Sequence, residues 1–226
     1  MHSIVFMRAF CLLTVSLALF ANDIKILFTS ALIETKFEER KEEYIKSLKI
    51  LDLYEWKDKT YIIEAGPETH RSFFPPYAKH IFYANTNNPL IRNKGVNEST
   101  SLIKALKFLH FDENAMILKM TGRYFFNSDK LLKTIENHPE IDAFIKCDVW
   151  GQVFTGCYAL RCKYMVEFYN QLDLQKMESE FINVEREAAN FINKLEAENK
   201  IKVLRLDHLD VTANIFGFGT PDLTFW

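Results

Sequence analysis

Short β-rich runs alternate with amphipathic helical segments along the chain from residue 24 onward. The predicted strands cover residues 24–29, 60–64, 81–84, 115–120, 141–146, 152–160 and 202–206. The predicted helices cover residues 36–51, 98–109, 129–137, 163–172 and 177–198. Strands that alternate with helices favour a parallel sheet, because each crossover helix packs back onto one of its faces. The pattern therefore predicts an α/β fold, a three-layer sandwich with a mostly parallel central sheet.

The N-terminal segment is set apart from this pattern by its apolar character. Residues 9–21 (AFCLLTVSLALFA) follow the single cation Arg8 and end in small residues, which is the layout of a signal peptide. The run is shorter than the roughly 20 residues that cross a bilayer core. We expect residues 1–21 to be a signal peptide; a short uncleaved membrane anchor, or a segment without a targeting role, is the alternative. The expected location is the secretory pathway or a membrane, and the cytoplasm if the segment is not a signal.

The rest of the chain, residues 23–226, is expected to form a single domain, since no linker or repeat divides it. The formal net charge is −2, with 28 basic and 30 acidic residues, so no basic field is present that would attract a nucleic acid. Outside the N-terminal segment the cysteines are Cys147, Cys157 and Cys162, whose spacing fits neither a disulfide framework nor a zinc site. We expect buried free thiols.

The passage RNKGVNE at residues 92–98 is polar and opens the helix predicted at 98–109. Arg92 and Lys94 beside a helix N-terminus, with a glycine that lets the backbone approach, form a place for a phosphate. Asn93 and Asn97 would add directional amide hydrogen bonds. A capped surface loop, in which Asn97 or Glu98 satisfies the N–H groups of the first turn, explains the same residues equally well.

A second passage, KMTGR at residues 119–123, ends a predicted buried strand, where ligands collect in open α/β sheets. Lys119 and Arg123 flank Thr121 and Gly122 next to apolar residues, and an unpaired cation there is costly. Each needs an anion, which is either a phosphate or carboxylate of a ligand or an internal Glu or Asp. We favour the ligand.

A third passage contains Thr155, Gly156 and Tyr158. Thr-Gly allows a backbone to lie close to a ligand, and the tyrosine ring is able to stack on a sugar. A β-bulge in a packed sheet is the alternative.

The carboxylate for proton transfer is not singled out by its sequence neighbours, because a general base needs a place in a pocket above all. We take Glu178, near the start of the helix predicted at 177–198, as the candidate catalytic carboxylate. The other candidates of this kind are Glu64, Asp148, Glu180, His208 and Asp210.

Seven segments of the chain, taken in order, resemble a branch of short bacterial and viral proteins related to the GT-A-type glycosyltransferases. They are FTSALIE at 28–34, ERKEEYIKSL at 39–48, YIIEAG at 61–66, RNKGVNES at 92–99, ILKMTGRYFF at 117–126, TGCYALRCKY at 155–164 and ANIFGFG at 213–219. The resemblance covers nearly all of the chain after the N-terminal segment. It implies a Rossmann-like GT-A architecture, with a nucleotide-binding half that is followed by an acceptor-binding half.

The passages above and the resemblance together give the residues that we expect to bind the substrates. The donor-binding set is Thr29, Ser30, Glu64, Arg92, Asn93, Lys94, Asn97, Thr121 and Gly122. Thr155, Gly156 and Tyr158 would bind the acceptor. The chain departs from the family at residues 119–123, which stand where the family has an Asp-x-Asp metal motif. Lys119 and Arg123 would then stabilise the departing phosphate themselves, so no cofactor or metal is expected, although Mn²⁺ or Mg²⁺ is an alternative.

The function implied is transfer of a sugar from a nucleotide-sugar donor to a glycan or lipid-linked acceptor, in the synthesis of a surface polysaccharide or glycoconjugate. The N-terminal segment would supply any membrane association. A catalytically inactive nucleotide- or glycan-binding protein on the same fold is the alternative, and a secreted interaction protein is a third class.

Overall fold

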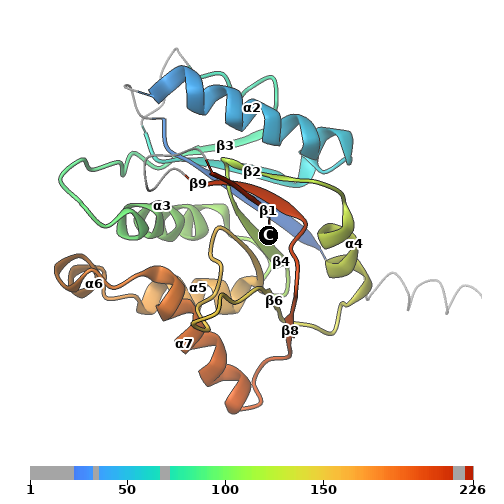
Figure 1. The fold of residues 1–226 in the computed structure, drawn as a ribbon, viewed down its shortest axis with the longest axis vertical. Coiled ribbons are helices and arrows are strands. Elements are labelled where there is room, and N and C mark those ends of the chain that lie inside the picture. Colours follow the sequence, from blue (N-terminus) through green and yellow to red (C-terminus); the bar gives the residue numbers. More distant parts are fainter. Residues whose placement is uncertain (1–22, 33–35, 67–71, 216–221, 226) are drawn as a thin grey trace, which may run out of the picture.

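The fold is described here from a computed structural model that covers residues 23–32, 36–66, 72–215 and 222–225 (Figure 1). The predicted signal peptide or anchor at residues 1–21 lies outside the described residues, as do parts of the segments 28–34 and 213–219. Within the described part of the chain, no helix combines the length and the apolar character needed to cross a membrane.

Seven strands form the central sheet in the order β3-β2-β1-β4-β7-β6-β8. They are β1 (Ile24–Ser30), β2 (Thr60–Glu64), β3 (His80–Tyr83), β4 (Met116–Thr121), β6 (Ala143–Ile145), β7 (Cys157–Arg161) and β8 (Val203–Arg205). Four of the six pairings between neighbours are parallel, and only the two that involve β7 are antiparallel. The predicted mostly parallel α/β sheet is confirmed. β1 lies between β2 and β4, so the carboxyl ends of these three strands meet at one edge.

Helices cover both faces of this sheet, as Figure 1 shows. They are α2 (Phe37–Leu53), α3 (Lys94–Leu109), α4 (Lys130–Asn137), α5 (Cys162–Gln171), α6 (Leu174–Glu180) and α7 (Val184–Ala197), with a short 3₁₀ helix, η2 (Lys57–Lys59). Successive side chains of β1 point to opposite faces of the sheet. Leu27 belongs to the core beneath α3, α5 and α7, whereas Phe28 packs edge-on against Tyr44 of α2 on the other face. The three-layer sandwich is therefore confirmed.

A second, smaller antiparallel sheet was not predicted. It has the order β10-β9-β5, formed by β5 (Tyr124–Phe126), β9 (Val211–Ile215) and β10 (Asp222–Phe225). β5 has only three residues, and its partner strand lies at the other end of the chain, with Phe125 opposite Thr212. Alternation over three residues carries too little signal, so this pairing depends on the tertiary fold.

Two predicted helices differ from the structure by more than two residues at an end. α3 begins at Lys94 rather than at residue 98, because Asn93 caps it and residues 94–97 form its first turn. The predicted helix 177–198 is two helices, since Phe181 adopts a left-handed backbone with φ of 52° that ends α6. Asn183 then caps α7 by accepting from the Arg186 N–H.

The strand predicted at 152–160 is also shorter than expected. Regular pairing begins only at Cys157, and Val153 makes an isolated bridge to Cys147 across a turn. The Asp148 side chain accepts from the backbone N–H groups of Trp150 and Gln152 and so holds this turn. Residues 152–156 are consequently a loop beside the end of β4, where the Thr121 N–H donates to the Gly156 carbonyl.

Candidate functional site

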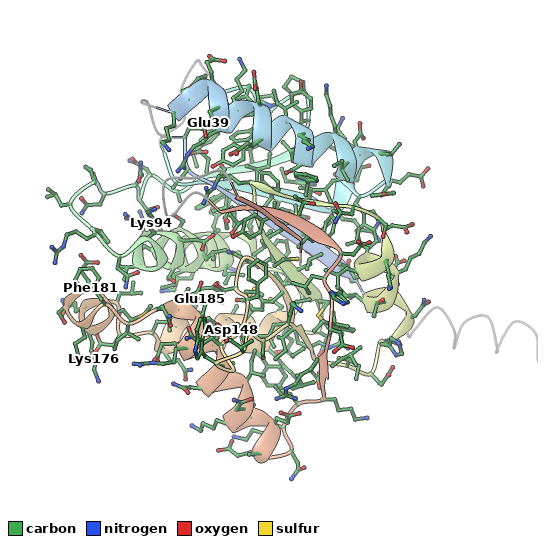
Figure 2. The ribbon with its side chains drawn as sticks, viewed as in Figure 1. Glu39, Lys94, Asp148, Lys176, Phe181 and Glu185 are labelled. Atoms are coloured by element: carbon green, nitrogen blue, oxygen red, sulfur yellow. The ribbon has the colours of Figure 1, made fainter. Side chains whose placement is uncertain are left out.

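A cavity of about 740 Å³ opens at the carboxyl ends of β1 and β4, where ligands bind in open α/β sheets. Four cationic side chains line it, Arg40, Arg92, Lys94 and Arg123, together with two carboxylates, Glu98 and Glu185. Five asparagines also line it: Asn87, Asn88, Asn93, Asn97 and Asn183. Figure 2 labels Lys94 at the start of α3 and Glu185 at the start of α7. The cavity is thus rich in groups that bind phosphates and hydroxyls.

The structure brings ten of the predicted site residues to this cavity. They are Thr29, Ser30, Arg92, Asn93, Lys94, Asn97, Thr121, Arg123, Thr155 and Gly156. Five others do not line it: Glu64, Lys119, Gly122, Tyr158 and Glu178. The ten come from four separate stretches of sequence that meet at one edge of the sheet.

Lys119 has an internal counter-ion, so the favoured prediction for this residue is wrong. Its Nζ lies 2.8 Å from Oε1 of Glu98, and the side chain is only 1% exposed. The same nitrogen donates to the Thr155 carbonyl at 2.8 Å and to the Thr121 hydroxyl at 3.0 Å. The three N–H donors of the ammonium therefore all have acceptors within the protein, and none is available to a ligand's phosphate.

Glu98 is the carboxylate of this ion pair, and it lines the cavity where Lys119 does not. The Thr29 hydroxyl donates to its Oε1 at 2.6 Å, and the Thr121 hydroxyl donates at 3.4 Å. Burial by itself would raise the pKa of Glu98, but the Lys119 charge and the hydrogen bonds from Lys119, Thr29 and Thr121 outweigh burial and lower it. Glu98 is therefore an anion at neutral pH.

Glu178 holds the backbone that precedes α3 and does not line the cavity, which argues against the role of catalytic carboxylate predicted for it. Its two carboxylate oxygens accept from the backbone N–H groups of Arg92 and Asn93, at 2.9 and 3.0 Å. The Asn93 amide in turn donates to the carbonyls of Met177 and Ile182. These contacts fix α6 against the start of α3.

Asn93 is the cap of α3, so the capping alternative for residues 92–98 is confirmed with a different capping residue, while the phosphate site at Arg92 and Lys94 stays a prediction. Its side chain accepts from the Gly95 N–H at 3.0 Å, which satisfies one donor of the first helical turn. A Cβ added at Gly95 would lie 3.2 Å from this Asn93 oxygen and 3.4 Å from Val184, so α3 and α7 approach closely here. The cations Arg92 and Lys94 are both exposed and still line the cavity.

Gly122 permits a close approach rather than a ligand contact. A Cβ at this position would lie 2.5 Å from the Phe28 ring and 2.8 Å from the Thr29 carbonyl. The Gly122 N–H donates to that carbonyl at 2.8 Å. The next residue, Arg123, then lies at the cavity, and its charge opposes the effect of burial, which raises the pKa of Tyr124 to about 12.

The predicted acceptor-binding residues divide between the cavity and the core. The Thr155 hydroxyl donates to Glu185 at 2.7 Å, and Gly156 passes so close to Tyr124 that an added Cβ would lie 2.1 Å from its ring. Tyr158 is buried, because its side chain in β7 points into the core, where its hydroxyl donates to Tyr169 at 3.1 Å. Its predicted sugar contact is wrong.

Glu64 also forms hydrogen bonds within the protein. It is 2% exposed and accepts from the Ser30 hydroxyl and from the N–H groups of Leu32 and Gly66. It therefore organises the ends of β1 and β2 around the cavity instead of lining it.

Residues 119–123, which contain no Asp or Glu, do not supply the ligands of an Asp-x-Asp metal site. Among the residues that the structure describes, no three His, Cys, Asp or Glu side chains converge as metal ligands. The end of β4 instead places the ammonium of Lys119 against Glu98, and a cation next to an ammonium is repelled. The residues present therefore do not fit a divalent ion at this strand end.

Several cavity residues were missed from the sequence, notably Glu98, Glu185 and Arg40. Glu98 was visible only as a helix-capping group of the passage 92–98, and Arg40 only as one charge of an amphipathic helix. Arg40 donates to the Ala31 carbonyl at 2.5 Å from the start of α2. No local signal distinguishes it from the other charged residues of that helix.

No protein-family model matches the chain, and no curated protein matches it. Among solved structures, it is similar to a glycosyltransferase involved in the glycosylation of the major capsid of PBCV-1, at 14% identity over 81% of each chain, with a TM-score of 0.47. It is similar to the glycosyltransferase GlyE of Streptococcus pneumoniae TIGR4, at 13% identity and a TM-score of 0.48, over 83% of this chain and 45% of that one. It is also similar to the galactosyltransferase LgtC, at 11% identity and a TM-score of 0.45, over 80% and 72% of the two chains.

The chain spans less than half of the GlyE chain. The three TM-scores lie below 0.5.

Proposed function

We propose that this protein transfers a sugar from a nucleotide-sugar donor to a glycan or lipid-linked acceptor. The observation that carries the proposal is the cavity at the carboxyl ends of β1 and β4, which combines Arg92, Lys94 and Arg123 with carboxylates and asparagine amides. Cations suit a diphosphate, whereas carboxylates and amides suit the hydroxyl groups of sugars. A volume of about 740 Å³ is within the ordinary range for a site that encloses a ligand of this size.

In this proposal the acceptor hydroxyl attacks the anomeric carbon and loses its proton to solvent, and the bond from that carbon to the diphosphate oxygen breaks. The electron pair of that bond leaves with the nucleoside diphosphate, so negative charge grows on the diphosphate. Arg92, Lys94 and Arg123 stabilise this charge, and one well-placed donor in a site that excludes water is worth about 3 kcal/mol of the barrier. Lys119 has a structural role instead, because it neutralises Glu98.

One observation favours a second candidate, a protein that binds a nucleotide or glycan without turnover. Lys119 lies at the strand end where the family that the chain resembles binds its metal, but its ammonium forms an internal ion pair with Glu98. The cavity would still bind a ligand in that case, but with one fewer group available to stabilise a leaving group.

The test is binding and turnover with a panel of four donors: UDP-glucose, UDP-galactose, UDP-N-acetylglucosamine and GDP-mannose. Thermal shift measures binding, and release of UDP or GDP measures donor hydrolysis or transfer. At least one donor should raise the melting temperature, and turnover should persist in EDTA. Arg123→Ala should weaken binding by about tenfold or more, as expected for loss of a charged hydrogen bond.

The matched control is Lys107→Ala, which removes an exposed cation of the same helix as Lys94 without touching the cavity. Stabilisation without turnover would establish the non-catalytic alternative. If no donor stabilises the protein, or if Lys107→Ala weakens binding as much as Arg123→Ala does, the proposal is wrong.

A further inference from the structure

Glu98 presents one of its two carboxylate oxygens to the cavity. Oε1 is held by three donors, the Thr29 hydroxyl at 2.6 Å, the Lys119 ammonium at 2.8 Å and the Thr121 hydroxyl at 3.4 Å. In the part of the chain that the structure describes, no donor reaches Oε2. The Glu98 side chain is 29% exposed, and Glu98 lines the cavity. A fixed acceptor oxygen is therefore available to a bound ligand.

The position of this oxygen limits which part of a ligand it can meet. A phosphate next to Glu98 would be repelled by a carboxylate of the same charge. A metal cation would lie beside the ammonium of Lys119, which is 2.8 Å from Oε1. A neutral group that carries hydrogen-bond donors has neither cost, and hydroxyl groups are the donors that a nucleotide sugar carries in number.

We propose that Glu98 recognises a hydroxyl group of the bound nucleotide sugar, which donates to Oε2, while the cations Arg92, Lys94 and Arg123 hold the diphosphate. The inference rests on the proposed function and deepens it, because it assigns the specificity for the sugar or ribose part to one carboxylate. The two kinds of charge in the cavity thereby orient the ligand. Thr29 and Thr121 act as positioning residues, since they hold Oε1 and so aim Oε2.

A hydroxyl group recognised in this way is a strong determinant of specificity. When the ligand lacks this hydroxyl, the carboxylate is still removed from water on binding but gains no hydrogen bond, so most of its desolvation cost weakens binding. A ligand that lacks the recognised hydroxyl should therefore bind roughly 10- to 100-fold more weakly.

The experiment couples the removal of a ligand hydroxyl to the removal of the Glu98 charge. Isothermal titration calorimetry measures the affinity of two kinds of ligand. These are the four donors of the panel and, for each donor, the deoxy analogues that lack one hydroxyl of the sugar or the ribose. The proteins are the full-length chain, Glu98→Gln, and the double variant Glu98→Gln with Lys119→Met. The double variant leaves no buried ammonium without a partner, so it keeps the test valid if Glu98→Gln alone does not fold.

The expected result is that one deoxy analogue loses about 10- to 100-fold in affinity for the natural protein and less than threefold for the folded variant. Glu180→Gln is the control, because Glu180 is exposed and does not line the cavity. It should show the same loss as the natural protein.

The inference is overturned if donors bind but every deoxy analogue loses the same affinity in the Glu98 variants as in the natural protein. In that case the proposed function stands. If no donor of the panel binds to the natural protein, the proposed function fails and the assignment of Glu98 fails with it.

Discussion

The ion pair between Glu98 and Lys119 gives a prediction whose size follows from the geometry. In Glu98→Gln the ammonium of Lys119, which is 1% exposed, loses the carboxylate of its ion pair and retains the Thr155 carbonyl and the Thr121 hydroxyl. Removing one partner of a buried pair costs about 3–5 kcal/mol. The two remaining acceptors place this case at the lower end, about 3 kcal/mol. For a domain of this size that lowers the melting temperature by roughly 6–12 °C.

The two partners are not equivalent, and the difference provides the internal control. Lys119→Met leaves Glu98 with two hydroxyl donors and 29% of its side chain exposed, so it should cost only about 1–2 kcal/mol. The double variant leaves no buried charge without a partner and should recover most of the loss, because both members of the ion pair are replaced by uncharged side chains. Urea denaturation followed by circular dichroism at pH 7 measures all three. A loss below 1 kcal/mol in Glu98→Gln, or no recovery in the double variant, would refute the reasoning.

Three further predictions concern pH, thiol chemistry and packing. The pKa of Glu98 in the folded state lies below its usual 4.5, so the Glu98 carboxylate stabilises the fold above pH 4.5, and this stabilisation is lost as the pH falls through the lowered pKa. The difference in the free energy of unfolding between the natural protein and Glu98→Gln should therefore shrink below pH 4.5, as measured by urea titrations. Burial raises the pKa of Cys157 to about 12, so iodoacetamide at pH 8 should modify the half-buried Cys147 faster than Cys157, as read by peptide mass spectrometry; equal rates at the two cysteines would contradict this. Gly122→Ala should cost about 1–3 kcal/mol in urea denaturation, since its Cβ would overlap the Phe28 ring, and an unchanged midpoint would show that the close approach is relieved without cost.

The correct parts of the sequence-based picture are those with local causes. Apolar runs such as residues 115–120 and helical stripes such as 36–51 predict their elements because their periodicity is written in neighbouring residues. The place of the site was predictable for the same reason, since the passage 119–123 contains the carboxyl end of the strand that became β4. Ten predicted site residues do line one cavity there.

The errors concern which long-range partner a side chain finds. The sequence shows that Lys119 needs an anion, but Glu98 lies on a different element and was considered only in the capping alternative for residues 92–98. Similarly, Glu178 is 85 and 86 residues away from the backbone N–H groups that it binds. No pattern within a window of sequence reports such pairs.

The sequence by itself determined the alternation of strands and helices, hence the layered α/β fold, and the need for a counter-charge beside β4, because these depend on periodicity and on the cost of burying a charge. Only the tertiary structure decided that this counter-charge is Glu98, and that Glu98 rather than Lys119 faces the cavity. The physical reason is that the parallel register of β1 and β4 brings Thr29 and Thr121 together, and the cap at Asn93 sets the turn of α3 that points Glu98 at them.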